Sequence, residues 1–446
     1  MYKRQDFLSF SLADAITASL GSLESVVVRS SLAAARFKAE APDLPALASE
    51  LDVNVAVTGT LLRAGAEVRV ATQLVDVESG RLLWSKTTQV TLNDIFQLQD
   101  DLTRQIVESL SLPLSARERR MLSQDTPASA RSYEYYLRAN ELASDPKSWG
   151  IARDLYQQAI DEDPRYAPAW ARLGGIFRRI GKLGAGSDED IIRAEAAVGR
   201  ALELNPELPL AHSLAAQFDI DRGRARDAMV RLTGSATRRS TDPELFAGLV
   251  YACRYCGLLG ASLRADLRAR RLDPSIKTSA VHTLFMLGQH DAVVASGVEA
   301  PAVVTFSLLA LGREQDALRL LDETDRIVPP RIRGVLRVMR LLIEDRRDEV
   351  IAGIDAIAPD FRDAEGVYYL ARQSAYVGAA DQAMQLLERA TGAGFWCYPL
   401  LASDDWLASL RDRPDFITLL RRAEQELALA SAAFAGAGGD RILGSD

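Results

Sequence analysis

The chain has 446 residues, of which 48% are apolar and 26% are charged, and these are the proportions of a folded globular protein rather than of a disordered or membrane-spanning one. Its 53 lysines and arginines against 61 aspartates and glutamates give a formal net charge of −8, which argues against a general nucleic-acid-binding protein with a basic face. Three cysteines are too few for a disulfide framework, so we expect a cytoplasmic chain. From the acidic charge we expect no nucleic acid as a partner, and from the apolar content we expect no membrane segment.

The first five residues differ in character from those that follow. Back-translated, residues 1–5 resemble the end of a transposon adapter that is used in sequencing libraries. We therefore expect a non-native scar there, with native sequence from about Asp6 and a domain lost upstream.

Residues 6–114 predict a small α/β domain. Apolar residues at helical spacing indicate helices over about 12–20, 44–51 and 93–112. β-branched runs and alternating apolar residues predict strands at 25–29, 54–62, 67–76 and 82–90. Ala64-Gly65 and Ser79-Gly80 are turn signals between the last three strands, so these strands should form an antiparallel sheet.

Beyond a polar linker at 115–131, four stretches end in the same way, at Asp163-Pro164, Asn205-Pro206, Asp242-Pro243 and Asp273-Pro274. Small residues recur at fixed offsets ahead of three of these prolines, and they let two helices of a hairpin pack closely. Pro206 and Pro274 are 68 residues apart, twice the roughly 34-residue period of the tetratricopeptide repeat. The spacing therefore predicts an all-α tetratricopeptide-repeat superhelix over 132–394, closed by a helical cap at 395–434 and a disordered Gly-rich tail at 435–446. The fold class expected for the whole chain is α+β.

The N-terminal segments resemble the TolB-like module that precedes tetratricopeptide repeats in many bacterial signalling proteins. The matching segments are VVVRSSLAAARF (26–37), LASELDVNVAVTGTLLRAGAEVRVATQLVDVESGRLLWS (47–85) and DIFQLQDDLTRQIVESL (94–110). The family's module opens with a strand of the V-L-P-F type that this chain lacks, which supports truncation. The resemblance implies that a Ser/Thr protein kinase, a winged-helix DNA-binding domain or a nucleotide cyclase lies in front, and the chain looks most like the kinase-linked group.

Residues that could carry chemistry are few, and we assign no catalytic residue, metal ligand or cofactor. The histidines are His212, His282 and His290, and His212 takes the place of a packing aromatic in a repeat helix. Cys253 and Cys256 have the spacing of a redox pair or half a zinc site, but a structural zinc needs four ligands and Cys253 falls on a core position. Packing is the interpretation that we favour for these two thiols.

A binding surface remains as the functional feature. In this repeat the first helix of each hairpin lines the concave groove, and its groove positions give Arg178, Arg179, Gln217, Tyr251, Arg254, Tyr368 and Arg372. Arginine binds carboxylates and tyrosine offers apolar contact, so this set suits an extended peptide or a partner protein. The alternative is that these residues are solvated charges and core aromatics.

The sequence thus predicts a non-catalytic interaction or sensor region of a bacterial signalling protein. One alternative is a fragment of a Ser/Thr protein kinase whose catalytic domain is missing. Another is a fragment of a winged-helix transcription regulator or a nucleotide cyclase.

Overall fold

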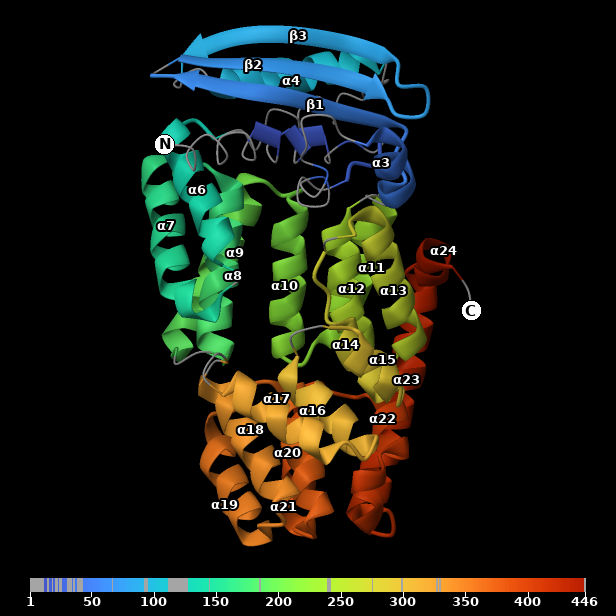
Figure 1. The fold of residues 1–446 in the computed structure, drawn as a ribbon. Helices are drawn as coiled ribbons and strands as arrows, with labels where there is room; N and C mark the ends of the chain where they lie inside the picture. The colour runs from blue at the N-terminus through green and yellow to red at the C-terminus, as the bar shows by residue number, and fades with distance from the viewer. Residues whose placement is uncertain are drawn as a thin grey trace.

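The computed structural model describes residues 12–13, 16–17, 19–20, 23, 26–29, 34, 37, 43–65, 67–91, 95–110, 127–143, 145–183, 186–238, 242–274, 276–297, 300–325, 328 and 330–444. A three-stranded sheet lies across one end of a large helical body (Figure 1). The expected fold class is confirmed: a small N-terminal α/β unit precedes a superhelix of helical hairpins. The expected scar at 1–5 and most of the expected linker lie outside the described residues.

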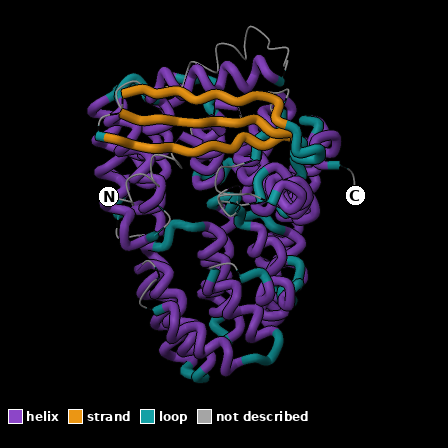
Figure 2. The backbone as a smooth tube through the Cα atoms, turned by 45° about the horizontal axis from the view of Figure 1, so that its top comes forward, coloured by secondary structure: helices purple, strands orange, loops and turns teal. Residues whose placement is uncertain are grey.

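The N-terminal unit consists of α3 (Leu44–Leu51), β1 (Val55–Ala64), β2 (Glu67–Asp76), β3 (Leu82–Thr91) and α4 (Ile95–Ser109). The strands pair antiparallel in the order β1-β2-β3, because short turns at Gly65 and Gly80, both with positive φ, connect them. Val68, Val70 and Leu74 of β2 face Leu98 and Leu102 of α4 and form the core. The opposite face of the sheet is exposed except at one end, where Ala56 packs against α3, and the three strands run side by side in front of the helices in Figure 2.

The strand expected at 25–29 does not form over residues 26–29, which are described as irregular. Val26 and Val28 pack against the sheet and helix core without joining the ladder. Valine-rich sequence favours extended backbone, but a strand also needs a neighbour to pair with, and pairing is a tertiary property. Arg29 instead donates hydrogen bonds to main-chain oxygens of Asp52 and of Leu272, 3.0 and 3.1 Å away.

Eight helical hairpins follow within the described residues. Their helices are α6 (Ala130–Leu142), α7 (Trp149–Glu162), α8 (Ala167–Leu183), α9 (Asp188–Leu204), α10 (Pro209–Asp221), α11 (Ala225–Arg238), α12 (Pro243–Tyr255), α13 (Leu259–Leu272), α14 (Ala280–Met286), α15 (His290–Ala295), α16 (Pro301–Ala310), α17 (Glu314–Thr324), α18 (Pro330–Ile343), α19 (Arg347–Ile357), α20 (Ala364–Tyr376) and α21 (Ala380–Gly392). Small residues allow the two helices of a hairpin to approach each other closely. A Cβ on Gly174 of α8, for example, would lie 2.6 Å from Cγ2 of Val198 on α9.

The four Asp/Asn-Pro pairs do not all play one structural role. Pro164, Pro206 and Pro274 follow the ends of α7, α9 and α13, as predicted. Pro243 is instead the first residue of α12, where the Asp242 side chain accepts a hydrogen bond from the Glu244 amide as the N-cap. This difference explains why the small-residue offsets recur ahead of only three of the prolines.

The C-terminal segment closes the array and reaches back along it. It contains α22 (Tyr398–Ser403), a 3-10 helix (Asp405–Leu410), α23 (Pro414–Gly436) and α24 (Gly439–Leu443), and α23 and α24 run beside α11 and α13 (Figure 1). The disorder expected over 435–446 is therefore wrong for 435–444. Gly439 packs directly on the Phe434 ring, where a Cβ would lie 2.3 Å from a ring carbon, so glycine here permits a contact.

Two hydrophobic cores organise the repeats, and α10 contributes to both. Leu214 and Phe218 of α10 belong to the core that begins in α6, whereas Ala216 and Ile220 belong to the larger core that extends to α23. None of the described helices combines the length and the apolar character that crossing a bilayer requires.

Candidate partner-binding wall

The inner wall, the surface formed by the first helices α6, α8, α10 and α12, carries five of the seven predicted contact residues. Arg254, at the end of α12, is buried rather than exposed. Its Nε and Nη2 atoms donate to Oε2 of Glu365 on α20 at 3.1 and 3.0 Å, and its Nη1 donates to Ser279. Arg254 therefore joins two helices of the array, and the expectation that it faces a partner from a groove is corrected.

Tyr368 and Arg372 of α20 are also buried, so they too are corrected as exposed groove residues. Both donate hydrogen bonds to Asp404, with the Arg372 Nε atom 2.8 Å from Oδ2. The Arg372 guanidinium lies over three aromatic rings, with ring centroids 5.2, 4.5 and 4.1 Å away, and these belong to Phe285, Phe306 and Trp406. This arrangement is a cation–π cage filled by the chain's own arginine.

Arg178, Gln217 and Tyr251 meet in one polar cluster, as their shared wall predicts. Arg178 on α8 donates to Gln217 at 2.8 Å and to Asp221 of α10 at 2.7 Å. Lys182, one turn further along α8, contacts Oδ1 of Asp221 at 2.7 Å and Oδ2 of Asp363 at 2.5 Å, and donates to the Tyr251 hydroxyl.

Charge pairing in this cluster outweighs burial. Burial alone would raise the pKa of Asp221, but Arg178 and Lys182 lower it to about 2. Burial likewise disfavours the charged form of Lys182, yet Asp221 and Asp363 raise its pKa above the usual lysine range. The charges of Arg178, Lys182 and Asp221 therefore stabilise one another, and Asp363 adds a second carboxylate beside Lys182.

Arg179 is exposed and is the most accessible of the seven residues. Its Nη1 atom donates to the Ala143 carbonyl at 2.9 Å, and among the described residues no carboxylate forms an ion pair with it. Surrounding protein lowers the pKa of the Arg179 guanidinium, and nearby Arg172 lowers it further. Arg179 thus lies close to a second cation, Arg172, on the same helix.

Half-buried tyrosines continue this part of the wall onto α6. Tyr133 and Tyr136 stack with centroids 6.2 Å apart, and Tyr136 also meets Tyr166 edge-on at 5.1 Å. Burial would lower the pKa of Arg172, but Tyr136, Tyr156 and Glu244 outweigh that effect and raise it. Tyr133, Tyr136, Arg172 and Arg179 are called the aromatic–basic patch below.

Sequence patterns alone did not identify five charged residues of this site, which are Lys182, Asp221, Asp363, Glu365 and Asp404. Local spacing could have found two of them, since Lys182 follows Arg178 by four residues and Asp221 follows Gln217 by four, each on one helix face. No local signal pairs Arg254 with Glu365, because 111 residues separate them.

The cysteines and histidines hold structural positions. Cys253 and Cys256 are buried free thiols, and burial raises the pKa of Cys256 to about 12. His282 contacts Glu365 at 2.6 Å, His290 contacts Ser307 at 3.3 Å, and His212 contacts the Pro206 carbonyl at 2.8 Å. Within the described ranges no cluster of three or more His, Cys, Asp or Glu side chains could hold a metal ion.

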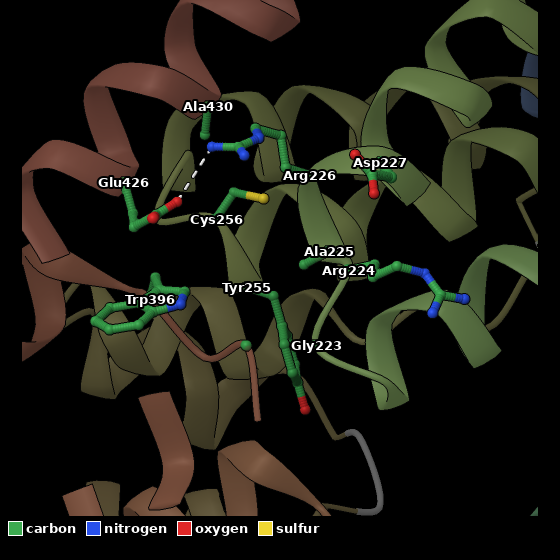
Figure 3. Close-up of a pocket in the computed structure, with 11 residues that line it drawn as sticks. Gly223, Arg224, Ala225, Arg226, Asp227, Tyr255, Cys256, Trp396, Glu426 and Ala430 are labelled. Atoms are coloured by element: carbon green, nitrogen blue, oxygen red, sulfur yellow. Dashed lines mark hydrogen bonds and ion pairs between the residues drawn. The ribbon is translucent and has the colours of Figure 1, made fainter. Parts of the chain in front are cut away.

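A cavity of about 280 Å³ lies at the seam between the α10–α11 turn, the end of α12 and α23. Arg226 and Glu426 face each other across it, 3.1 Å apart, with the Cys256 sulfur beside them (Figure 3). Gly223 and Gly394, both with positive φ, bring two loops into contact at its edge. The Arg226–Glu426 ion pair thus joins α11 to α23 at this cavity, whose lining also includes Arg224 and Asp227.

No known family model matches the chain. A protein of Rhizobium meliloti (strain 1021) named "Putative adenylate cyclase 3" is 24% identical over 212 residues, which are 47% of this chain and 36% of that protein. The chain thus spans little more than a third of the length of this curated relative. Among solved structures, the human IFIT1 dimer with m7Gppp-AAAA shares 13% identity at a TM-score of 0.31, over 78% of each chain. Yeast Tom70 shares 13% identity at a TM-score of 0.26, over 77% of this chain and 80% of its own.

Proposed function

We propose that this chain is a non-catalytic, cytoplasmic region of a bacterial signalling protein that binds a peptide or a partner domain on its inner wall. The aromatic–basic patch carries the proposal. There Arg172 of α8 lies against Tyr136, and the exposed guanidinium of Arg179, further along α8, donates to the Ala143 carbonyl at the end of α6 and forms no ion pair with a described carboxylate. Tyrosine and arginine are the residues most enriched at the energetic centres of protein interfaces.

The bacterial signalling context rests on the resemblance to TolB-like modules and on the matched relative. That relative carries a cyclase name, and nucleotide cyclases are one of the three classes that the resemblance implies. As a second candidate, we propose that this chain is a region of a nucleotide cyclase rather than of a Ser/Thr kinase or a winged-helix regulator. Genomic sequence upstream of the Asp6 codon distinguishes these classes.

The binding proposal is tested with peptides selected on the purified chain from a displayed library. Fluorescence anisotropy then compares their affinity for the wild type, Arg179→Glu and Arg193→Glu. Arg193 is exposed on α9, a second helix outside the inner wall, so it provides a matched charge reversal. We expect at least a tenfold loss for Arg179→Glu, which corresponds to about 1.4 kcal/mol, and no change for Arg193→Glu. Equal affinity for both variants, or no selected binder, contradicts the proposal.

A further inference from the structure

The inner wall is closed from below by the chain's own C-terminal repeats. α14 to α21 lie beneath α8, α10 and α12 in Figure 1, and the turn before α20 reaches the end of α8. Where the turn before α20 meets α8 and α9, the described side-chain pairs are ionic: Lys182 meets Asp363, and Arg362 meets Asp188. At α12, by contrast, the closure includes a shared hydrophobic core. The group of Arg178, Lys182, Asp221 and Asp363 is called the clasp below.

The clasp spans the boundary between the two hydrophobic cores. α8 belongs to the first core and α20 to the second, and α10, which contributes to both, is the element between them. Polar contacts between separately packed cores are easier to separate than a shared apolar core, because water can solvate both partners after separation. α10 is thus the position about which the cores can open.

The two carboxylate oxygens of Asp363 contact different parts of the chain. Its Oδ1 atom accepts the Gly366 amide at 2.7 Å as the N-cap of α20, whereas Oδ2 meets Lys182 at 2.5 Å. Asp363 thus supplies one of the two carboxylates that the structure places against Lys182, the other being Asp221. Only 9% of the Lys182 side chain is exposed, so removal of the Asp363 charge would favour a carboxylate from elsewhere at this position.

We propose that Arg178, Lys182 and Tyr251 form a carboxylate-binding surface that Asp363 occupies in the closed chain, and that an acidic peptide partner binds by replacing Asp363. This inference rests on the proposed function and adds the partner's chemistry. The guanidinium of Arg178 and the ammonium of Lys182 bind carboxylates through charge-assisted hydrogen bonds. Tyr251 adds a ring face, which Lys182 and Arg254 already approach at 5.5 and 5.2 Å from the centroid.

Asp363→Asn tests the inference because asparagine retains the N-cap acceptor while removing the charge. The matched control is Asp43→Asn, since Asp43 caps α3 through the Ala46 amide and lies outside the clasp. The probe is a fluorescein-labelled peptide of alternating glutamate and leucine, with a glutamine version as its neutral analogue. We expect the acidic probe to bind Asp363→Asn at least tenfold more tightly than the wild type or Asp43→Asn. The neutral probe should not distinguish them.

Opening is measured by energy transfer between dyes on Ile192→Cys and Asp348→Cys. The native cysteines are buried, so added surface thiols label selectively. Transfer should fall on addition of the acidic probe, and Lys182→Met should abolish binding in the Asp363→Asn background. If Asp363→Asn misfolds, Asp363→Ser is used in its place, because a serine side chain can also cap the N-terminus of α20.

Equal affinity of the acidic probe for wild type and Asp363→Asn overturns the inference. If peptides sensitive to Arg179→Glu still bind both proteins equally, the clasp proposal fails and the proposed function stands. If no selected peptide depends on Arg179, the proposed function fails, whatever the clasp does.

Discussion

Arg254 and Glu365 form a buried ion pair across 111 residues of chain, with 2% and 4% of their side chains exposed. Tyr369 and His282 also contact this carboxylate, at 2.8 and 2.6 Å. The pair fixes α12 against α20 and so determines how the C-terminal repeats close the inner wall. An arginine that composition and spacing suggest for a partner is thus used within the array.

Breaking this pair should destabilise the fold instead of weakening binding. We expect Arg254→Ala to lower the free energy of unfolding by about 3 kcal/mol or more, because it leaves the buried Glu365 carboxylate without its cation. Urea denaturation followed by circular dichroism measures this. The double variant Arg254→Met/Glu365→Leu should recover most of the loss. Arg193→Ala, an exposed control, should change stability by about 0.5 kcal/mol or less. A loss for Arg254→Ala as small as the control's would show that the pair contributes nothing.

Asp221 should make stability depend on acid pH. Arg178 and Lys182, working against burial, lower its pKa from 3.8 to about 2 in the folded chain. A carboxyl with a lowered folded pKa contributes stability above its ordinary pKa, and the contribution is lost as the pH falls from about 4 towards 2. The difference in unfolding free energy between wild type and Asp221→Asn should therefore shrink by roughly 2 kcal/mol between pH 6 and pH 2. A difference that stays constant over this range would contradict the shifted pKa.

The three thiols should be unreactive in the folded chain. Burial raises the pKa of Cys256 and of Cys397 to about 12 and raises that of Cys253 as well. Since the thiolate is the reactive form, a chromogenic disulfide reagent at pH 8 should label the native chain only at its rate of opening. Full labelling should follow denaturation. Rapid native labelling, or a Cys253–Cys256 disulfide in an oxidising buffer, would revive the redox-pair interpretation.

The contact between Gly223 and Gly394 should be intolerant of a side chain. Both Gly394 and Gly378 have a positive φ, of 92° and 86°, so alanine is strained at either position. A Cβ on Gly394 would also lie 2.4 Å from the Gly223 Cα, whereas nothing lies within 4 Å of a Cβ on Gly378. Gly378→Ala should cost about 1–2 kcal/mol and Gly394→Ala clearly more, by thermal or urea unfolding. Equal costs would mean that the two loops adjust without loss.

How far the sequence predicts the site depends on the range of each contact. Turn glycines, strand alternation and the periodic small residues predict the sheet and the hairpins, because these patterns act between neighbours along the chain. The shared face of Arg178 and Lys182 on α8 also follows from helical periodicity, whereas the contact of Lys182 with Tyr251 of α12 depends on how the repeats stack. Local patterns do not predict the irregular backbone at 26–29 or the ordered helix α24. The pairing of residues 26–29 and the packing of α24 both depend on distant segments of the chain.

The sequence by itself determined the hairpin repeat, the side of each helix that faces inward, and the acidic, thiol-poor composition. Only the tertiary structure decided that Arg254, Tyr368 and Arg372 are buried, while Arg179 stays accessible. Exposure on a superhelix depends on what the rest of the chain places over the inner wall. Here Glu365 of α20 meets Arg254, and Asp404 of the segment after the repeats meets Tyr368 and Arg372, so the chain itself supplies the carboxylates that an outside partner would otherwise provide.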